Sequence, residues 1–333
     1  MDQLLQQPPS LINGSLFFLA AAGLLGIVLG FVTYAIYFER KFIGWMQFRH
    51  GPTRTGPLGL LQTVADVLKL LLKEDIMPKL VDRPLFILAP LIAFIPSFTV
   101  LATMPFTETL HFANLNIGIL YYIAVSGITV LGVITGGWAS NNKYALLGAM
   151  RSVASMISYE IPLIMSLVGV ILMTGSLNLI DIVKQQEAMG MWFFIPQFLG
   201  FAVFMVASVA ELNRTPFDLP EAEQELVSGY HVEYSGFRMA FFFLSEYVYV
   251  FGMASLTTVV FLGGWLPPFS FLGFIPGIVW FVIKFASVVF FYIWLRATMP
   301  RLPAKWLMQL GWKVLLPLAL VNIFLTALLK EFL

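Results

Sequence analysis

Residues 15–38, SLFFLAAAGLLGIVLGFVTYAIYF, form an apolar stretch without a charged side chain. A helix of about 20 apolar residues crosses the roughly 30 Å hydrocarbon core of a bilayer, so this stretch predicts a transmembrane helix. Further stretches of similar length and hydropathy follow it along the chain. We expect about eight spans, near residues 15–38, 84–104, 116–138, 154–174, 192–210, 237–262, 274–295 and 312–332. The predicted fold is all-α and polytopic, with residues 1–333 as a single integral membrane domain.

The composition supports this fold class and excludes several functions. Of 333 residues, 59% are hydrophobic and 11% are charged, against about 25% charged in an average soluble domain. The absence of cysteine excludes disulfides, thiolate zinc sites and iron–sulfur clusters held by this chain alone. A net charge of +1 gives no indication of nucleic-acid binding, and we expect no metal site. The polar start, 1–15, lacks Lys and Arg and gives no sign of a cleavable signal.

The basic residues predict the orientation. Sixteen of the 19 Lys and Arg residues lie in or beside the loops that follow the first, third, fifth and seventh spans. The opposite side holds only Lys184 and Lys330, and Lys284 lies within a span. By the positive-inside rule, loops 139–153 and 211–236 are cytoplasmic, whereas loops 105–115 and 175–191 and both termini are outside.

One further helix is predicted to lie in the membrane interface. Within 58–73, apolar residues recur at helical spacing on one face, and polar residues take the other. Such an amphipathic helix after the first span lies along the cytoplasmic surface of a bilayer. It either anchors a long loop or forms the floor of a site for a lipid-soluble ligand, and the pattern does not separate these interpretations.

Charged residues inside spans need an explanation, because each costs about 2.5–3.5 kcal/mol on insertion scales. Glu39 and Arg40 end the first span, where an interfacial position explains them. For Lys284, a salt bridge between helices and a functional role are equal alternatives. Glu160 and Glu246 favour function, because burial disfavours the charged form of a carboxyl group and lets it pass protons near neutral pH.

The loop at 211–236 reads ELNRTPFDLPEAEQELVSGYHVEYSG, with six acidic residues. Asp218 can cap a short helix with Glu221 at its third position, but this does not account for the remaining acids. A solvated acidic loop is the alternative. The interleaved large apolar residues argue against it, since a freely solvated loop does not need them.

This loop closely resembles the corresponding loop in the family of H-type membrane subunits of bacterial NADH–quinone oxidoreductase, whose mitochondrial relative is chain 1 of complex I. The resemblance covers nearly the whole chain, and the acidic motif is very specific. One departure is Thr53 in Gly51-Pro52-Thr53, where the family usually has Asn. The other matching stretches are Glu39-Arg-Lys, Arg49–Gly56, Leu60–Lys69, Lys73-Glu-Asp, Gly137–Tyr144 and Ser158-Tyr-Glu.

The resemblance implies a non-catalytic subunit of a proton-translocating enzyme in the bacterial inner membrane, with quinone as substrate. It implies that FMN and iron–sulfur clusters are on partner subunits of the hydrophilic arm and that antiporter-like subunits are membrane partners. The implied proton path contains Glu160, Glu211, Asp218, Glu221, Glu223, Glu225 and Glu246. The implied quinone-binding residues are Arg40, Asp66, Lys69, Phe217 and Arg296.

Two alternatives remain from the sequence. The same type of subunit occurs in complexes with another electron donor, such as membrane-bound hydrogenases. An independent secondary transporter with Glu160 and Glu246 as its ion site is a further alternative. Transporters often show two related halves, and no such repeat is visible.

Overall fold

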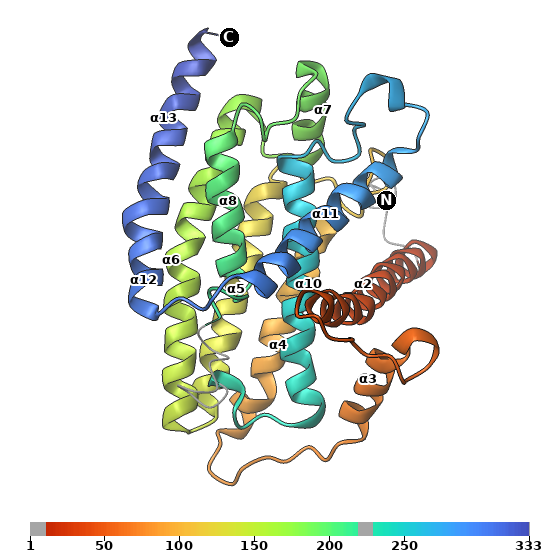
Figure 1. The fold of residues 1–333 in the computed structure, drawn as a ribbon, viewed down its shortest axis with the longest axis vertical. Coiled ribbons are helices and arrows are strands. Elements are labelled where there is room, and N and C mark those ends of the chain that lie inside the picture. The colour runs from red at the N-terminus through yellow and green to blue at the C-terminus, as the bar shows by residue number, and fades with distance from the viewer. Residues whose placement is uncertain (1–10, 219–228, 333) are drawn as a thin grey trace.

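The computed structural model describes residues 11–218 and 229–332, and within them it contains helices and loops but no strand (Figure 1). Glu221, Glu223 and Glu225 of the expected proton path therefore lie outside the described residues. The α-helices are α2 (Leu11–Met46), α3 (Gln62–Leu72), α4 (Arg83–Thr99), α5 (Gly118–Ala139), α6 (Lys143–Thr174), α7 (Leu179–Met189), α8 (Phe198–Glu211), α10 (Gly236–Val260), α11 (Gly277–Thr298), α12 (Ala304–Gln309) and α13 (Leu316–Phe332).

Seven helical stretches in the described part of the chain are long and apolar enough to cross a membrane. The shorter apolar helix α8 accompanies them, and the prediction of an all-α polytopic membrane protein is confirmed. One of the seven stretches, Ala304–Glu331, joins α12 to α13 through a π-helical turn, Leu310–Leu315.

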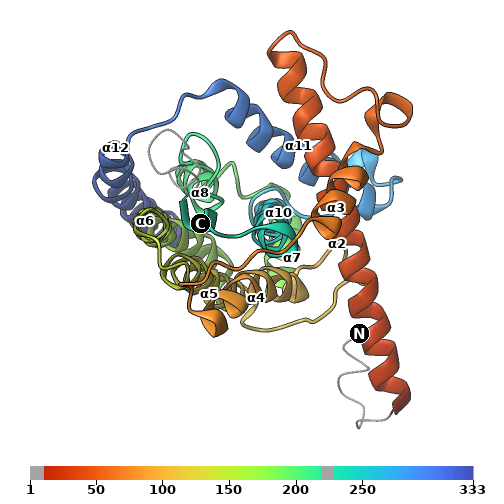
Figure 2. The ribbon, with the colours of Figure 1, turned by 90° about the horizontal axis from the view of Figure 1, so that it is seen from below.

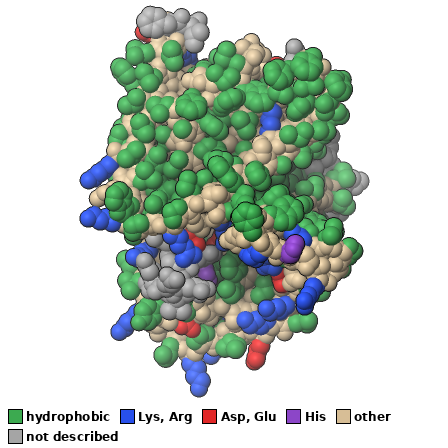
Figure 3. Space-filling model, in the orientation of Figure 1, with side chains coloured by type: hydrophobic (Ala, Val, Ile, Leu, Met, Phe, Trp, Pro, Cys, Tyr) green, Lys and Arg blue, Asp and Glu red, His purple; other side chains and the backbone are tan. Residues whose placement is uncertain are grey.

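The helices form a bundle in which α13, α6, α5, α4 and α10 pack in succession, with α8 against α6 (Figure 1). Helices α11 and α2 cross the bundle obliquely and pack on α10, and α2 extends well beyond the bundle in Figure 2. Lys and Arg side chains gather over the lower half of the face in Figure 3, while its upper part is mainly apolar.

Close approach between helices depends on small residues, as is typical in membranes. A Cβ atom on Gly132 of α5 would lie 2.6 Å from the backbone nitrogen of Ala93 on α4. The two backbones therefore pack together only because Gly132 has no side chain. Next to this contact, Ser245 of α10 donates a hydrogen bond to the Ala93 carbonyl at 3.1 Å.

Two expected helix starts were wrong. Helix α6 begins at Lys143, 11 residues before the expected start at 154, because the Asn142 side chain caps it by accepting from the Tyr144 N–H at 2.9 Å. Hydropathy missed this first part because it carries Lys143 and Arg151. Glu160 consequently lies about 25 Å along the helix at 1.5 Å per residue, deeper than the turn or two expected from the sequence.

Helix α8 begins at Phe198 and not at 192, because Pro196 precedes it and the backbone before it bonds elsewhere. The Phe193 N–H donates to Oε1 of Gln186 at 3.0 Å, and the Phe194 N–H donates to the Phe261 carbonyl at 3.0 Å. Non-helical backbone at membrane depth is tolerated only where protein satisfies it, and here the neighbouring helices do so.

The region expected to be a simple outer loop, 175–191, contains a helix that the hydropathy pattern did not indicate. Helix α7 is capped by Asn178, whose side chain accepts from the Ile180 N–H at 2.9 Å. Its buried Gln186 donates to the Val259 carbonyl at 3.0 Å and so reaches the end of α10. Asn178 and Gln186 thus fix α7 to the bundle.

Lys284 of α11 has no acidic partner among the described residues, so the salt bridge considered from the sequence is not what holds it. Its Nζ donates to three backbone carbonyls that follow α10, those of Leu262 at 2.6 Å, Gly264 at 3.0 Å and Leu266 at 2.6 Å. The ammonium group also lies 4.1 Å from the centroid of the Trp192 ring. Lys284 therefore ties the loop after α10 to α11.

Replacing Lys284 by Met should lower the stability of the folded chain by about 2–4 kcal/mol, because three carbonyls lose a charged donor. The change can be measured as a lower thermal unfolding midpoint of the purified protein. Lys184→Met is the matched control, because the exposed Lys184–Glu108 pair at 3.1 Å should contribute little. Equal midpoints for the two variants would contradict this role for Lys284.

Candidate functional site

A buried ion cluster lies where α2, α10, α11 and the loop after α8 meet. We define it as Glu39, Arg214, Tyr247 and Arg296. Glu39 Oε1 accepts from Arg214 Nη1 at 3.3 Å and also pairs with Arg296 Nη1. Glu39 Oε2 accepts from the Tyr247 hydroxyl at 2.8 Å, and the Arg214 guanidinium lies 4.3 Å from the centroid of the Tyr247 ring. A small cavity opens between these four side chains.

The cluster gives the carboxylate of Glu39 an environment that compensates for its burial. Its side chain is only 9% exposed, and such a carboxylate requires opposite charge and hydrogen bonds. Two guanidinium groups and one phenol supply them. Since one carboxylate faces two permanently charged arginines, the cluster carries a net positive charge and can attract an anionic or polarised ligand group.

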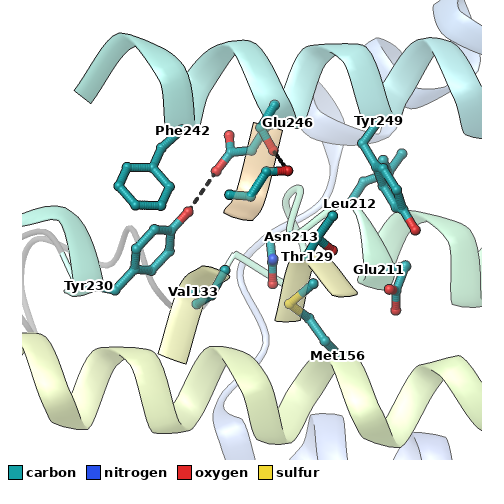
Figure 4. Close-up of a pocket in the computed structure, with 12 residues that line it drawn as sticks. Thr129, Val133, Met156, Glu211, Leu212, Asn213, Tyr230, Phe242, Glu246 and Tyr249 are labelled. Atoms are coloured by element: carbon teal, nitrogen blue, oxygen red, sulfur yellow. Dashed lines mark hydrogen bonds between the residues drawn. The ribbon is translucent and has the colours of Figure 1, made fainter. Parts of the chain in front are cut away.

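A second cavity, which we name the carboxylate cavity, lies between α4, α5, α6, α8 and α10 (Figure 4). Glu211 and Glu246 both line it, from the end of α8 and from α10. The Tyr230 hydroxyl donates to Glu246 Oε1 at 3.2 Å. The other polar residues on its wall are Thr129, Asn213, Ser245 and Tyr249. The structure thus brings two of the expected proton-path residues to one cavity.

Glu160 lies beside this cavity on α6. A Cβ atom on Gly127 of α5 would lie 3.0 Å from Glu160 Oε1, so the absence of a side chain at Gly127 leaves space for the carboxylate. Met156, one turn earlier on the same helix, lines the cavity. Glu160 is also close enough to Glu211 for their charges to interact. These two carboxyl groups cannot both ionise independently.

Only a short segment separates the ion cluster from the carboxylate cavity. Asn213 faces the carboxylate cavity, and the next residue, Arg214, faces the cavity of the ion cluster. On α10, the neighbours Glu246 and Tyr247 divide in the same way. Successive residues of a helix point about 100° apart, so one turn of α10 presents polar groups to both cavities.

A third feature is an open groove of about 500 Å³ beside the end of α2. Arg40 lines this groove, although its neighbour Glu39 belongs to the ion cluster. Arg40 Nη1 donates to Asp66 Oδ2 at 2.5 Å, and Gln62 donates to the other oxygen of Asp66 at 3.1 Å. The remaining lining residues are Ile43, Arg49, His50, Gly51, Pro52, Thr53, Arg54 and Gln62.

The structure brings Arg40 and Asp66 together but distributes the other expected quinone-binding residues. Lys69 is exposed in the last turn of α3, and Arg296 belongs to the ion cluster. Phe217 is buried in the core, with its ring edge-on to Tyr159 at 5.1 Å between centroids. Asp218 is buried and pairs with Arg301 at 3.0 Å. Phe217 and Asp218 therefore line neither the groove nor the cavity of the ion cluster.

Sequence reasoning missed three members of the ion cluster as functional residues, namely Glu39, Arg214 and Tyr247. It explained Glu39 by an interfacial position, whereas the side chain is buried. A signal existed in the helical period of α2. Val28, Val32 and Ala35 are buried at spacings of four and three residues, and Glu39 continues the same face four residues later.

His231 lies in the loop before α10, edge-on to the Tyr230 ring and against Phe243. Burial lowers its pKa to about 4, although the nearby Asp218 carboxylate favours the charged form. In the unfolded chain the pKa is about 6.5. Between these values the unfolded state binds more protons, so the stability contributed by neutral His231 is present above about pH 6.5 and falls as the solution is acidified.

His231→Gln should therefore make the folded chain less sensitive to acid. Between pH 7 and pH 5, the wild type should lose about 2 kcal/mol more stability than the variant. Thermal unfolding of both proteins at the two pH values measures the difference. The exposed His50 provides the control, and His50→Gln should follow the wild type. Equal acid sensitivity of wild type and His231→Gln would contradict this account.

Comparison with known proteins identifies a family that matches almost the whole chain. The family described as NADH dehydrogenase matches residues 19–327. A protein of Brevibacillus brevis, named as the H subunit of NADH-quinone oxidoreductase, is 65% identical over 332 residues, which cover 100% of this chain and 98% of that protein. Proteins of the same name from Anoxybacillus flavithermus and Bacillus thuringiensis are each 66% identical, with 99% of each chain covered. The resemblance seen in the acidic loop is confirmed, and the chain belongs to the NADH dehydrogenase family that contains these H subunits.

Proposed function

We propose that the chain is the membrane subunit of a bacterial proton-translocating NADH–quinone oxidoreductase, in which it forms a quinone chamber and links quinone reduction to proton movement. The names of its relatives support the enzyme complex. The observation that carries the mechanism is the short distance in sequence and space between the ion cluster and the carboxylate cavity. Asn213 and Arg214, adjacent in the chain, face one each.

The groove beside Arg40 is the proposed part of the quinone chamber. Its volume of about 500 Å³ lies within the range of ligand sites, about 300–1,000 Å³. The exposed apolar residues of α3, among them Val64, Leu68 and Leu71, offer a surface for an isoprenoid tail. The ion pair with Asp66 holds the Arg40 guanidinium at the groove, where it can donate to a quinone oxygen.

The ion cluster and the carboxylate cavity form the proposed link to proton movement. A quinone that accepts electrons gains negative charge, and the two arginines of the cluster respond to that charge. A change at Arg214 acts directly on the short segment that carries Glu211 and Asn213. In Glu211 Oε2 and Asn213 Oδ1, the cavity wall holds buried acceptors without partners among the described residues, and water in the cavity can bond to them.

The orientation follows from the same proposal. The groove carries Arg40, Arg49 and Arg54, and the ion cluster adds Arg214 and Arg296. We assign the side on which such basic residues gather to the cytoplasm. Both termini are then outside, in the inner membrane of a bacterium. The hydrophilic arm, with its flavin and iron–sulfur clusters, would join on the cytoplasmic side, and antiporter-like subunits would join within the membrane.

The central test replaces Glu160 or Glu211 by Gln in the assembled complex. Each change should lower quinone reduction and proton translocation together by at least about tenfold, because a neutral amide cannot exchange a proton. Both rates can be measured in vesicles that contain the purified complex. Glu187→Gln on the exposed face of α7 is the matched control and should leave both rates unchanged. Fully active and fully coupled Glu160→Gln and Glu211→Gln complexes would refute the proposed link.

Replacing Arg40 by Ala tests the chamber separately from the proton path. The apparent KM for quinone should rise about tenfold, because a charge-assisted hydrogen bond contributes about 1.5–3 kcal/mol. Electron transfer to a water-soluble acceptor at the flavin site should not change. The exposed Lys79 lies in the loop before α4, outside the groove, and Lys79→Ala serves as the control. Unchanged quinone kinetics in an assembled Arg40→Ala complex would contradict the placement of quinone in the groove.

A further inference from the structure

The linker between α11 and α12, residues 299–303, holds the start of the acidic loop. Arg301 Nη2 donates to Asp218 Oδ2 at 3.0 Å, and the Leu302 N–H donates to the Pro216 carbonyl at 3.1 Å. The Arg301 side chain is 49% exposed, but that of Asp218 is only 3% exposed. Because Asp218 is buried, losing its guanidinium partner costs much more than breaking a surface ion pair.

The helix that follows this linker contacts α6 next to Glu160. The buried Tyr159 hydroxyl donates to the carbonyl of Leu307 in α12 at 2.8 Å. The ring of Tyr159 also packs against Phe217, which precedes Asp218. Tyr159 therefore contacts both α12 and the anchored start of the acidic loop, and its backbone leads directly into Glu160.

The helix that precedes the linker ends in the ion cluster. Arg296 lies in the last turn of α11 and pairs with Glu39. Pro300 and Pro303 flank Arg301 and Leu302, and each proline fixes its own φ angle and restricts the residue before it. A linker restricted in this way transmits a displacement of the α11 end instead of absorbing it.

We propose that segment 296–307 is a mechanical connection between the ion cluster and Glu160, and that Arg301 and Tyr159 are its positioning residues. Arg296 senses the charge at the cluster, Arg301 holds the loop start at Asp218, and Leu307 holds Tyr159. This second route between the two sites passes through neither Asn213 nor α10. It rests on the proposed function, because it assigns a role to Glu160 in proton movement.

The experiment measures Arg301→Gln in the purified complex, reconstituted in vesicles. The kcat for quinone reduction, per assembled complex, should fall about fivefold or more, as expected when a coupling free energy is lost. The apparent KM for quinone should stay within about twofold of the wild type, since no ligand contact changes. Arg301→Lys should restore most of the kcat, because a lysine can still reach Asp218.

Two further variants separate this role from loss of a surface charge or of folding. Lys305→Gln removes a positive charge four residues away, at an exposed position that forms no ion pair with a described residue, and its kcat should equal that of the wild type. Tyr159→Phe removes only the hydroxyl that bonds to Leu307. It should lower the kcat, and combined with Arg301→Gln it should cause less than the sum of the two losses in free energy.

The outcomes discriminate clearly. A wild-type kcat in Arg301→Gln overturns the proposal, as does a loss no greater than that of Lys305→Gln. If Arg301→Gln prevents assembly, Tyr159→Phe decides, and an unchanged kcat in that variant overturns the proposal. If Glu160→Gln is impaired but Arg301→Gln and Tyr159→Phe are not, only this connection fails. If Glu160→Gln is itself fully active and coupled, the proposed function fails first.

Discussion

A carboxylate that leaves water must find opposite charge within the protein, and at Glu39 this requirement organises the region where four parts of the chain meet. Burial of one unpaired charge costs several kcal/mol. Arg214 from the loop after α8, Arg296 from α11 and Tyr247 from α10 all converge on the two oxygens of Glu39. The long helix α2 packs on α10 and α11, and this interaction fixes the position of its C-terminal end.

The same interaction determines which way the neighbouring residues point. Once Glu39 faces the cluster, the helical geometry of α2 turns Arg40 toward the groove and Asp66. Once Tyr247 faces Glu39, Glu246 turns toward the carboxylate cavity. One carboxylate with its partners thereby places a ligand-sized groove on one side and a set of carboxyl groups on the other. The proposed function depends on residues that are neighbours in sequence but face different compartments.

Elsewhere in the bundle the dominant requirement is that no backbone group remain unpaired in an apolar environment. Lys284 bonds to three carbonyls after α10, and Gln186 bonds to two more at the end of that helix. Buried Gln197 receives a hydrogen bond from Asn322 and donates one to Thr326, which joins the start of α8 to α13. These polar side chains stabilise irregular backbone, and this explains their presence within apolar segments without a catalytic role.

The sequence by itself determined the all-α membrane fold, the amphipathic helix after the first span and the family, because hydropathy over about 20 residues is a local property and the acidic motif is very specific. It also identified Glu160, Glu211 and Glu246 as unusual. Only the tertiary structure decided what Glu39 binds, since its two arginine partners are 175 and 257 residues away in the chain. The start of α8 and the presence of α7 likewise depend on contacts with α10. A local pattern reports how a segment meets lipid or water, whereas the pairing of a buried charge depends on which distant segments pack beside it.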